Sequence, residues 1–277
     1  MTWTYSDEYY KKYTRDTWNE SADAYDDVAR NLDLYSDRLL HHAAVRPTVR
    51  VLDVASGLGE PAFTMAKSAR SVLGIDLSER MVERSNALAK SRGATNVEFR
   101  VMDAEDLDLP GSSFDVATCR FGLQIVTDPD KTVAEVLRVL KPGGRFAATV
   151  WGPGERCPAI HVIIEPMLKH AEPDETGYIP TPYEMGGPGE LVAVMKKAGF
   201  ASATEERFTR DWTFANEDAW YRGVLQGTPI GHSLREEEKD VQEQVLRETA
   251  ANLQKWKQAD GSLRMPSEAV VVAARKG

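Results

Sequence analysis

The sequence has few cysteines, no excess of basic charge and no long apolar run. Its two cysteines, Cys119 and Cys157, lie in a chain of 277 residues, which indicates reduced thiols in a reducing compartment and excludes a disulfide framework. Acidic residues outnumber basic ones by 43 to 34, so binding to nucleic acid through broad phosphate neutralisation is not expected. No segment approaches the roughly 18 apolar residues of a membrane span, and residues 1–12 lack an apolar signal region. We therefore expect a cytoplasmic protein that acts on small molecules.

Metal-binding spacings are also lacking. The five histidines show no H-x-x-x-H pattern and no Cys/His pairing, so a metal site is not expected. What the chain does have is 42% hydrophobic and 28% charged residues, enough for a large core with a solvated surface. The composition predicts a globular protein.

Residues 8–45 have the pattern of a helical lead-in. Trp18, Ala22, Tyr25 and Ala29 recur at spacings of 4, 3 and 4 residues, which places them on one helical stripe. Because this stripe precedes the first strand, we expect residues 1–48 to cover the ligand edge of the sheet as a lid.

Residues 49–151 alternate between short apolar runs and helical periodicity. We expect strands at 49–54, 71–76, 97–102, 114–119 and 144–151 and helices near 60–69, 79–92 and 130–140. Apolar strands separated by helices are typical of a parallel sheet that is covered on both faces. The predicted fold class is therefore α/β, doubly wound and Rossmann-like.

Residues 152–277 are expected to complete the same single domain, 1–277. Helical periodicity at 162–170 and 190–200 is followed by a strand-like segment, 201–214. Ser233 and Glu236 have the spacing of a capping box and predict a helix start. Residues 267–276 read as a buried last strand, so the region before it is a helical insertion.

The glycine turn of VLDVASGLGE (51–60) follows the first strand and precedes a helix. Such a turn lies at the carboxyl edge of the sheet, where open α/β folds bind ligands, and Gly57 and Gly59 allow a close backbone approach. The pattern Gly57-x-Gly59-x-x-Ala62 also satisfies the dinucleotide fingerprint, with Asp76 ending the next strand. The turn alone leaves both cofactor classes open.

Asp53 favours one of them. It ends the first strand four residues before Gly57, where we expect it to face whatever the glycines hold. A carboxylate ~4 Å from a pyrophosphate is repelled by up to ~4 kcal/mol at an effective dielectric near 20. S-adenosylmethionine instead offers an ammonium and a positively charged sulfur there, and its ribose diol suits Asp76.

Four ordered motifs over about residues 15–151 resemble the class I S-adenosylmethionine-dependent methyltransferases, in particular the branch of the ubiquinone and menaquinone biosynthesis enzymes. They are VLDVASGLG, GIDLSERM (74–81), MDAEDLDLPGSSFDVATC (102–119) and VLRVLKPGGRF (136–146). The resemblance implies a mostly parallel sheet of seven strands. One departure is Ala55, which stands where the family pattern has its first glycine. It costs little if the position keeps a negative φ.

The resemblance also implies which residues hold the cofactor. The glycine motif contributes Asp53, Ala55, Gly57 and Gly59. Asp76 would bind the ribose, with Leu77 and Met81 against the adenine. Asp103 would accept from the adenine amino group and Ala104 would donate through its backbone, while Arg120 and Phe121 would lie beside the methionine end.

No catalytic base stands out. Methyl transfer from a sulfonium is an in-line displacement, for which alignment can supply ~7–11 kcal/mol, and a base is needed only for a hydroxyl or a carbon acid. Gln124, just after the fourth strand, and His161, after the fifth, are weak candidates, and each reads first as an ordinary polar residue.

Aromatic residues suggest an acceptor pocket for a planar or partly apolar small molecule. We expect Trp18 and Tyr25 of the lid to contribute, and Trp220 above all from the later segment. The other aromatic positions of that segment are Tyr178, Tyr183, Trp212, Phe214 and Tyr221. Aromatic residues at helical spacing are also common in cores, so the same positions fit a structural role.

Two other functions stay open. A nicotinamide oxidoreductase is disfavoured by Asp53 and by the lack of a Tyr-x-x-x-Lys proton donor. A non-catalytic cofactor-binding protein on the same fold would keep Asp53, Asp76 and Asp103 as they are.

Overall fold

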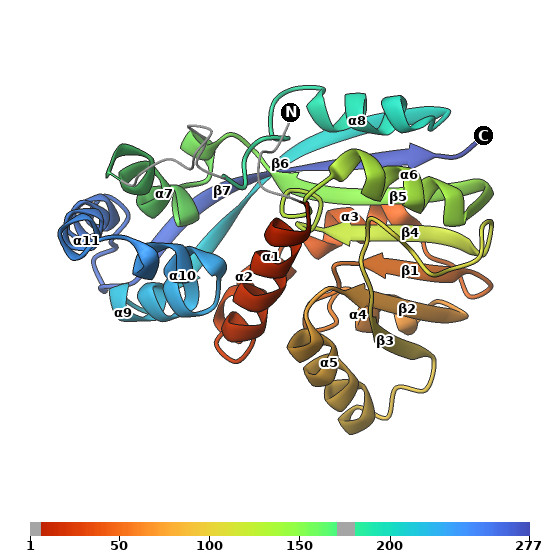
Figure 1. The fold of residues 1–277 in the computed structure, drawn as a ribbon, viewed down its shortest axis with the longest axis horizontal. Helices are drawn as coiled ribbons and strands as arrows, with labels where there is room; N and C mark the ends of the chain where they lie inside the picture. The colour runs from red at the N-terminus through yellow and green to blue at the C-terminus, as the bar shows by residue number, and fades with distance from the viewer. Residues whose placement is uncertain (1–6, 171–180) are drawn as a thin grey trace.

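The protein is built around one seven-stranded sheet with the strand order β3-β2-β1-β4-β5-β7-β6 (Figure 1). The computed structural model describes residues 7–170 and 181–277, so Tyr178 lies outside the described residues. The strands are β1 (Arg50–Val54), β2 (Ser71–Asp76), β3 (Val97–Val101), β4 (Phe114–Arg120), β5 (Leu140–Trp151), β6 (Ser202–Phe214) and β7 (Leu263–Arg275). Neighbouring strands among β1 to β5 pair in parallel, whereas β7 is antiparallel to β5 and β6.

Helices cover both faces of the sheet, which confirms the doubly wound α/β class. On one face α3 (Ser36–Ala43), α4 (Ala62–Ala66) and α5 (Glu79–Ser91) pack against Val51 and its neighbours. On the other face α6 (Pro129–Val139) and α8 (Glu190–Ala198) pack against Leu52 and Val54. Successive side chains of a strand point to opposite faces, so a run that is apolar throughout is buried on both.

The first helices cross the sheet's carboxyl edge, as Figure 1 shows for α1 and α2. The single helical stripe expected over this region is wrong in one respect. The chain forms α1 (Asp7–Ser21), a turn over residues 22–25 and then α2 (Asp26–Asp33). Because of this break, Val28 and Leu32 are buried on α2, whereas Ala29 is half-buried.

The helical insertion before the last strand is also confirmed. A short 3-10 turn, η1 (Gly154–Arg156), and α7 (Pro158–His170) follow β5. Between β6 and β7 lie α9 (Glu217–Tyr221), the π-helical η2 (Arg222–Gln226), α10 (Pro229–Glu236) and α11 (Lys239–Gln254). In Figure 1, α7, α9, α10 and α11 form a group at the same end of the sheet as α1 and α2.

The predicted helix start at Ser233 is wrong. Ser233 lies inside α10, where its hydroxyl donates to the Pro229 carbonyl oxygen. The helix begins at Pro229, and the side chain of Thr228 caps it by accepting from the Ile230 N–H. Proline is favoured in the first turn because its nitrogen has no hydrogen to leave unpaired there, so the Thr228-Pro229 pair sets the boundary.

Candidate active site

A cavity of about 480 Å³ opens at the carboxyl ends of β1, β2, β3 and β4. Its size is typical of small-molecule sites. The loops after these strands line one part of the cavity. Apolar side chains of α2, α7 and β5, including Leu32, Ile164 and Trp151, line another part. Helix α1 contributes to the wall along much of its length, from Tyr9 to Trp18. Among the described residues, those lining the cavity include no histidine.

The structure brings most of the predicted site residues to this cavity. Those on its wall are Trp18, Tyr25, Ala55, Gly57, Asp76, Leu77, Met81, Asp103, Ala104, Arg120, Phe121 and Gln124. Four other residues lie elsewhere: Asp53, Gly59, His161 and Trp220 do not line it. The cavity therefore joins segments that are far apart in the sequence.

The glycine turn is built differently from the expectation at two positions. Ala55 has a φ of 53°, not a negative one, so it adopts the left-handed conformation, which costs a non-glycine residue roughly 1–2 kcal/mol. Gly57 has a φ of 51°, and a Cβ added to it would lie 3.6 Å from the ring of Tyr25. Gly59 is a packing residue, because a Cβ there would lie 2.4 Å from Phe63.

Asp76 is placed at the end of β2 with its carboxylate on the cavity wall. One oxygen, Oδ2, accepts from the Gly57 N–H at 2.9 Å, and Oδ1 accepts from the Ser78 N–H at 2.9 Å. Burial raises the pKa of Asp76, whereas these backbone hydrogen bonds lower it. A carboxylate has about four acceptor positions, more than the backbone N–H groups of Gly57, Ser78 and Leu77 occupy.

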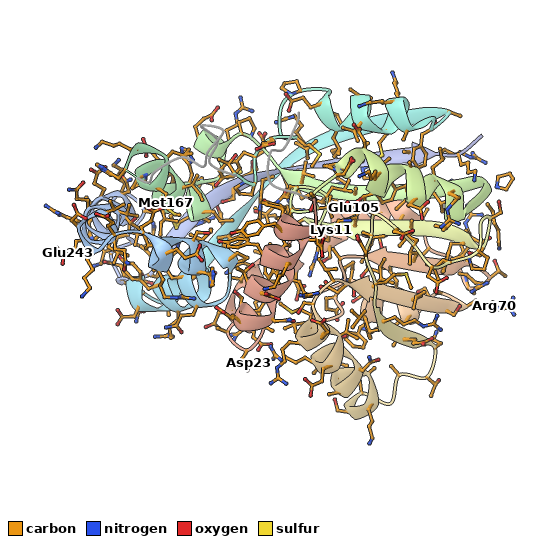
Figure 2. All side chains as sticks on the ribbon, in the orientation of Figure 1. Lys11, Asp23, Arg70, Glu105, Met167 and Glu243 are labelled. Atoms are coloured by element: carbon orange, nitrogen blue, oxygen red, sulfur yellow. The ribbon has the colours of Figure 1, made fainter. Side chains whose placement is uncertain are left out.

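Asp103 lies on the wall after β3. Its Oδ1 accepts from the Glu105 N–H at 2.9 Å, and its Oδ2 accepts from Lys11 Nζ at 2.7 Å. Glu105 is nearly buried, and its Oε1 accepts from the Asp128 N–H. Figure 2 shows Lys11 of α1 beside Glu105, to which it forms a second ion pair. The loop after β3 is thus fastened to the lead-in helix.

Asp53 lies within the sheet instead of on the cavity wall, which corrects its expected position. It pairs in register with Thr118 of β4, and the Thr118 hydroxyl donates to Asp53 Oδ1 at 2.6 Å. The other oxygen, Oδ2, is buried without a hydrogen-bond partner. Burial raises the pKa of Asp53 to about 7, although the hydrogen bond from Thr118 lowers it. An unpaired buried carboxylate is costly and favours a nearby cation.

Arg120 and Phe121 follow β4 along the cavity. The Arg120 guanidinium donates to Asp33 and Ser36 and to the backbone oxygen of Glu60, so it fixes α2 and the glycine turn relative to each other. Phe121 has a φ of 60° and stacks on Trp151 with ring centroids 3.9 Å apart.

Of the two weak candidates for chemistry, the structure brings one to the cavity. The side-chain oxygen of Gln124 accepts from the Trp151 N–H at 2.9 Å, which leaves its amide nitrogen as the donor for a ligand. His161 lies off the wall, with a buried Nδ1 that has no hydrogen-bond partner and its ring against Tyr183. It is not placed to act on a molecule in the cavity.

Trp220 is a core residue, which corrects its expected role in acceptor binding. Its side chain is fully buried, and its indole N–H donates to the Ala159 carbonyl oxygen at 2.8 Å. Trp18 and Tyr25 do line the cavity and meet edge to face, with ring centroids 5.5 Å apart. Burial raises the pKa of Tyr25 to about 12, so its phenol stays protonated at neutral pH.

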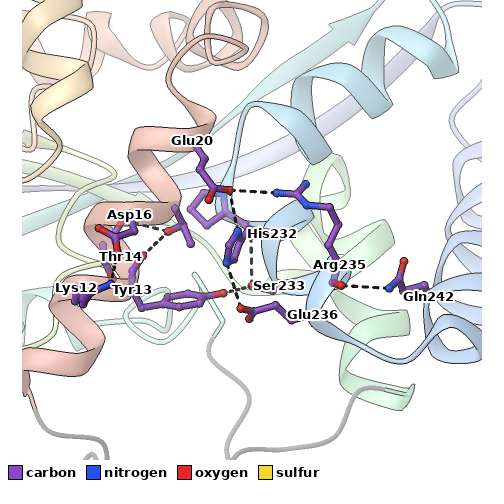
Figure 3. Close-up of polar contacts among 12 residues, drawn as sticks. Lys12, Tyr13, Thr14, Asp16, Glu20, His232, Ser233, Arg235, Glu236 and Gln242 are labelled. Carbon is purple, nitrogen blue, oxygen red and sulfur yellow. Dashed lines mark hydrogen bonds and ion pairs between the residues drawn. The ribbon is translucent and has the colours of Figure 1, made fainter.

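Sequence reasoning missed three features of the site. Lys11 reaches across 92 residues to Asp103. Gly122, on the wall, has no room for a side chain, since a Cβ would lie 2.5 Å from that of Ala55. Helix α10 meets α1 through the Tyr13 and Ser233 hydroxyls, 2.8 Å apart, and through His232 and Glu20 (Figure 3). Of these three features, only Gly122, which follows the end of β4, could have been noticed in the sequence.

Comparison with known proteins shows what the chain is similar to. Residues 52–148 match the methyltransferase domain family. The crystal structure of the YcgJ protein from Bacillus subtilis has the same fold, with a TM-score of 0.58 at 21% identity over 90% of this chain and 98% of that one.

Similar proteins include enzymes named for ubiquinone and menaquinone biosynthesis. It is 34% identical over 129 residues to an uncharacterized methyltransferase, YcgJ of Bacillus subtilis, covering 43% of this chain and 51% of the relative. It is 38% identical to a demethylmenaquinone methyltransferase of Clavibacter sepedonicus over 47% of this chain and 54% of the relative. A ubiquinone/menaquinone biosynthesis C-methyltransferase of Geotalea daltonii is also 38% identical, over 45% and 57%. The chain spans about half the length of these relatives.

None of the described helices is both long and apolar enough to cross a bilayer. Within residues 7–170 and 181–277, no three His, Cys, Asp or Glu side chains are grouped so as to hold a metal ion.

Proposed function

We propose that this protein transfers a methyl group from S-adenosylmethionine to a small-molecule acceptor with a large apolar body. The observation that carries the proposal is Asp76, whose carboxylate ends β2 on the cavity wall and is held there by the Gly57 and Ser78 N–H groups. A fixed carboxylate with free acceptor positions suits a ribose diol.

The residues present fit the rest of the cofactor. Leu77 and Met81 give an apolar surface next to Asp76, and Asp103 offers a carboxylate for an amino group. When bound, S-adenosylmethionine supplies a methyl group on a positively charged sulfur.

The protein's own contribution is alignment and the exclusion of water. Tyr25 lies over Gly57, and Arg120 ties α2 to the glycine turn, so the lead-in helices close the cavity above the cofactor loops. Well-oriented groups can gain ~7–11 kcal/mol over the reaction in solution. Gln124 provides a hydrogen-bond donor at the same edge, oriented by Trp151.

The acceptor side is apolar. Leu32, Ile164, Met167 and Trp212 come from α2, α7 and β6 and meet at the wall. Such a surface suits a planar or partly apolar molecule. One similar protein is named a demethylmenaquinone methyltransferase and another a ubiquinone/menaquinone biosynthesis C-methyltransferase, which supports carbon as the acceptor atom in this protein as well.

The direct test is incubation of the purified protein with methyl-labelled S-adenosylmethionine and a metabolite extract, followed by mass spectrometry of the products. We expect a labelled apolar product that is absent with heat-inactivated protein. If S-adenosylmethionine binds but no labelled product forms, the protein is a cofactor-binding protein without transfer activity. If a nicotinamide dinucleotide binds in its place, the protein is an oxidoreductase and the proposal is wrong.

A further inference from the structure

Lys11 on α1 joins the lead-in helix to the loop after β3. Its ammonium lies 2.7 Å from Asp103 Oδ2 and 2.8 Å from Glu105 Oε2. The Lys11 and Asp103 side chains are 27% and 30% exposed and that of Glu105 is 3% exposed, so the three charges are partly shielded from water. Like charges two residues apart repel, and the ammonium between them offsets that repulsion.

The other end of α1 is held by a different set of contacts. Asn19 accepts from the Ser78 hydroxyl at 2.6 Å and donates to Glu79 at 2.9 Å. These contacts fasten the carboxyl-terminal part of α1 to the start of α5. Lys11 fastens the amino-terminal part to the loop that carries Asp103. Helix α1 is therefore held on both sides of the predicted adenosine site.

One carboxylate serves both the lid and the ligand. Asp103 Oδ2 accepts from Lys11, and a carboxylate oxygen has two acceptor positions, so an amino group can bind Asp103 while Lys11 stays in place. Closure of the lid and recognition of the ligand then support each other through Asp103. Glu105 strengthens the link, because its own carboxylate is fixed by the Asp128 N–H at 2.8 Å.

We propose that Lys11 is a positioning residue that latches α1 to Asp103 and Glu105 and thereby sets how long the cofactor stays bound. This inference rests on the proposed function and deepens it. Because the latch is ionic and partly exposed, it weakens with salt, whose screening length falls from ~10 Å at 0.1 M to ~3 Å at 1 M. Release of the cofactor is therefore faster at high salt.

The test compares Lys11→Met with the matched control Lys12→Met. Lys12 is the next residue on α1, but it is exposed and pairs with Asp16 of the same helix at 2.6 Å. Surface plasmon resonance on the full chain gives the dissociation rate of S-adenosylhomocysteine at 0.1 M and 1 M salt. We expect Lys11→Met to release it three- to tenfold faster at 0.1 M and to lose most of the salt dependence. Lys12→Met should match the wild type, and Lys11→Arg should restore most of the residence time.

A second measurement reads the latch without any cofactor. Hydrogen exchange over residues 8–21 of the ligand-free protein should be faster in Lys11→Met than in Lys12→Met, with little change in the sheet. If Lys11→Met does not fold, Glu105→Gln tests the same latch, since its side-chain oxygen can still accept from Asp128. Equal release and equal exchange in the Lys11 and Lys12 variants would overturn the inference. Failure of the wild type to bind the cofactor would overturn the proposed function, and the exchange comparison would still decide whether the latch exists.

Discussion

Replacing Asp53 by asparagine should make the ligand-free protein more stable than the wild type at pH 8 but not at pH 5. Burial raises the pKa of Asp53 from its ordinary value of 3.8 to about 7. Between these two values the folded wild type binds one proton more than the unfolded chain, so its stability falls as the pH rises. From pH 5 to pH 7 the wild type therefore loses up to about 3 kcal/mol of its free energy of unfolding, at 1.36 kcal/mol per pH unit. The asparagine side chain does not titrate and can still accept from Thr118.

Urea unfolding at pH 5, 6, 7 and 8 measures this difference. Because both proteins are compared at each pH, the titration of every other group cancels. We expect the free energy of unfolding of the wild type to decrease relative to that of Asp53→Asn, mainly between pH 5 and pH 7. Parallel curves for the two proteins would refute the reasoning, since the pKa of Asp53 would then be the same in the folded protein as in the unfolded chain.

Three further predictions concern packing and the first two helices. Trp220→Ala should lower the free energy of unfolding by about 3–5 kcal/mol, as for other buried aromatic residues. At a temperature where the variant is folded, its affinity for S-adenosylmethionine should stay near that of the wild type, and a loss of binding without a loss of stability would contradict the core assignment. Gly122→Ala should cost about 1–3 kcal/mol, because the new Cβ would lie 2.5 Å from that of Ala55, and thermal denaturation checks it. Hydrogen exchange over residues 8–30 should slow when S-adenosylmethionine is added, and equal exchange with and without it would show a static helix pair.

The central strands could be predicted from the sequence because β1, β4 and β5 are buried at most of their positions. The predicted 71–76 strand coincides with β2, Ser71–Asp76. Helix boundaries in the polar segments were harder. The stripe from Trp18 to Ala29 continues at helical spacing across the turn at residues 22–25, so periodicity alone does not reveal the break. Ser233 and Glu236 had the spacing of a helix start, but Thr228 and Pro229 provide the real one.

The site could be predicted where it lies at strand ends. Asp76 and Asp103 lie at the ends of neighbouring parallel strands, so their side chains must meet at one edge of the sheet. Contacts made by α1 could not be predicted, because nothing local links Lys11 to a carboxylate 92 residues away. The role of Trp220 could not be predicted from the sequence either. Its size and its aromatic neighbours suit a pocket and a core equally well, and only the packing around it decides.

The most direct test of cofactor binding is calorimetry with S-adenosylmethionine on the wild type, on Asp76→Ala and on the control Asp108→Ala, an exposed carboxylate of the loop after β3. Charge-assisted hydrogen bonds of about 1.5–3 kcal/mol correspond to a loss of roughly 10- to 150-fold in affinity. We expect that loss for Asp76→Ala, wild-type affinity for Asp108→Ala, and no heat of binding with a nicotinamide dinucleotide. Unchanged S-adenosylmethionine binding by folded Asp76→Ala, or dinucleotide binding in its place, would contradict the assignment of this cavity.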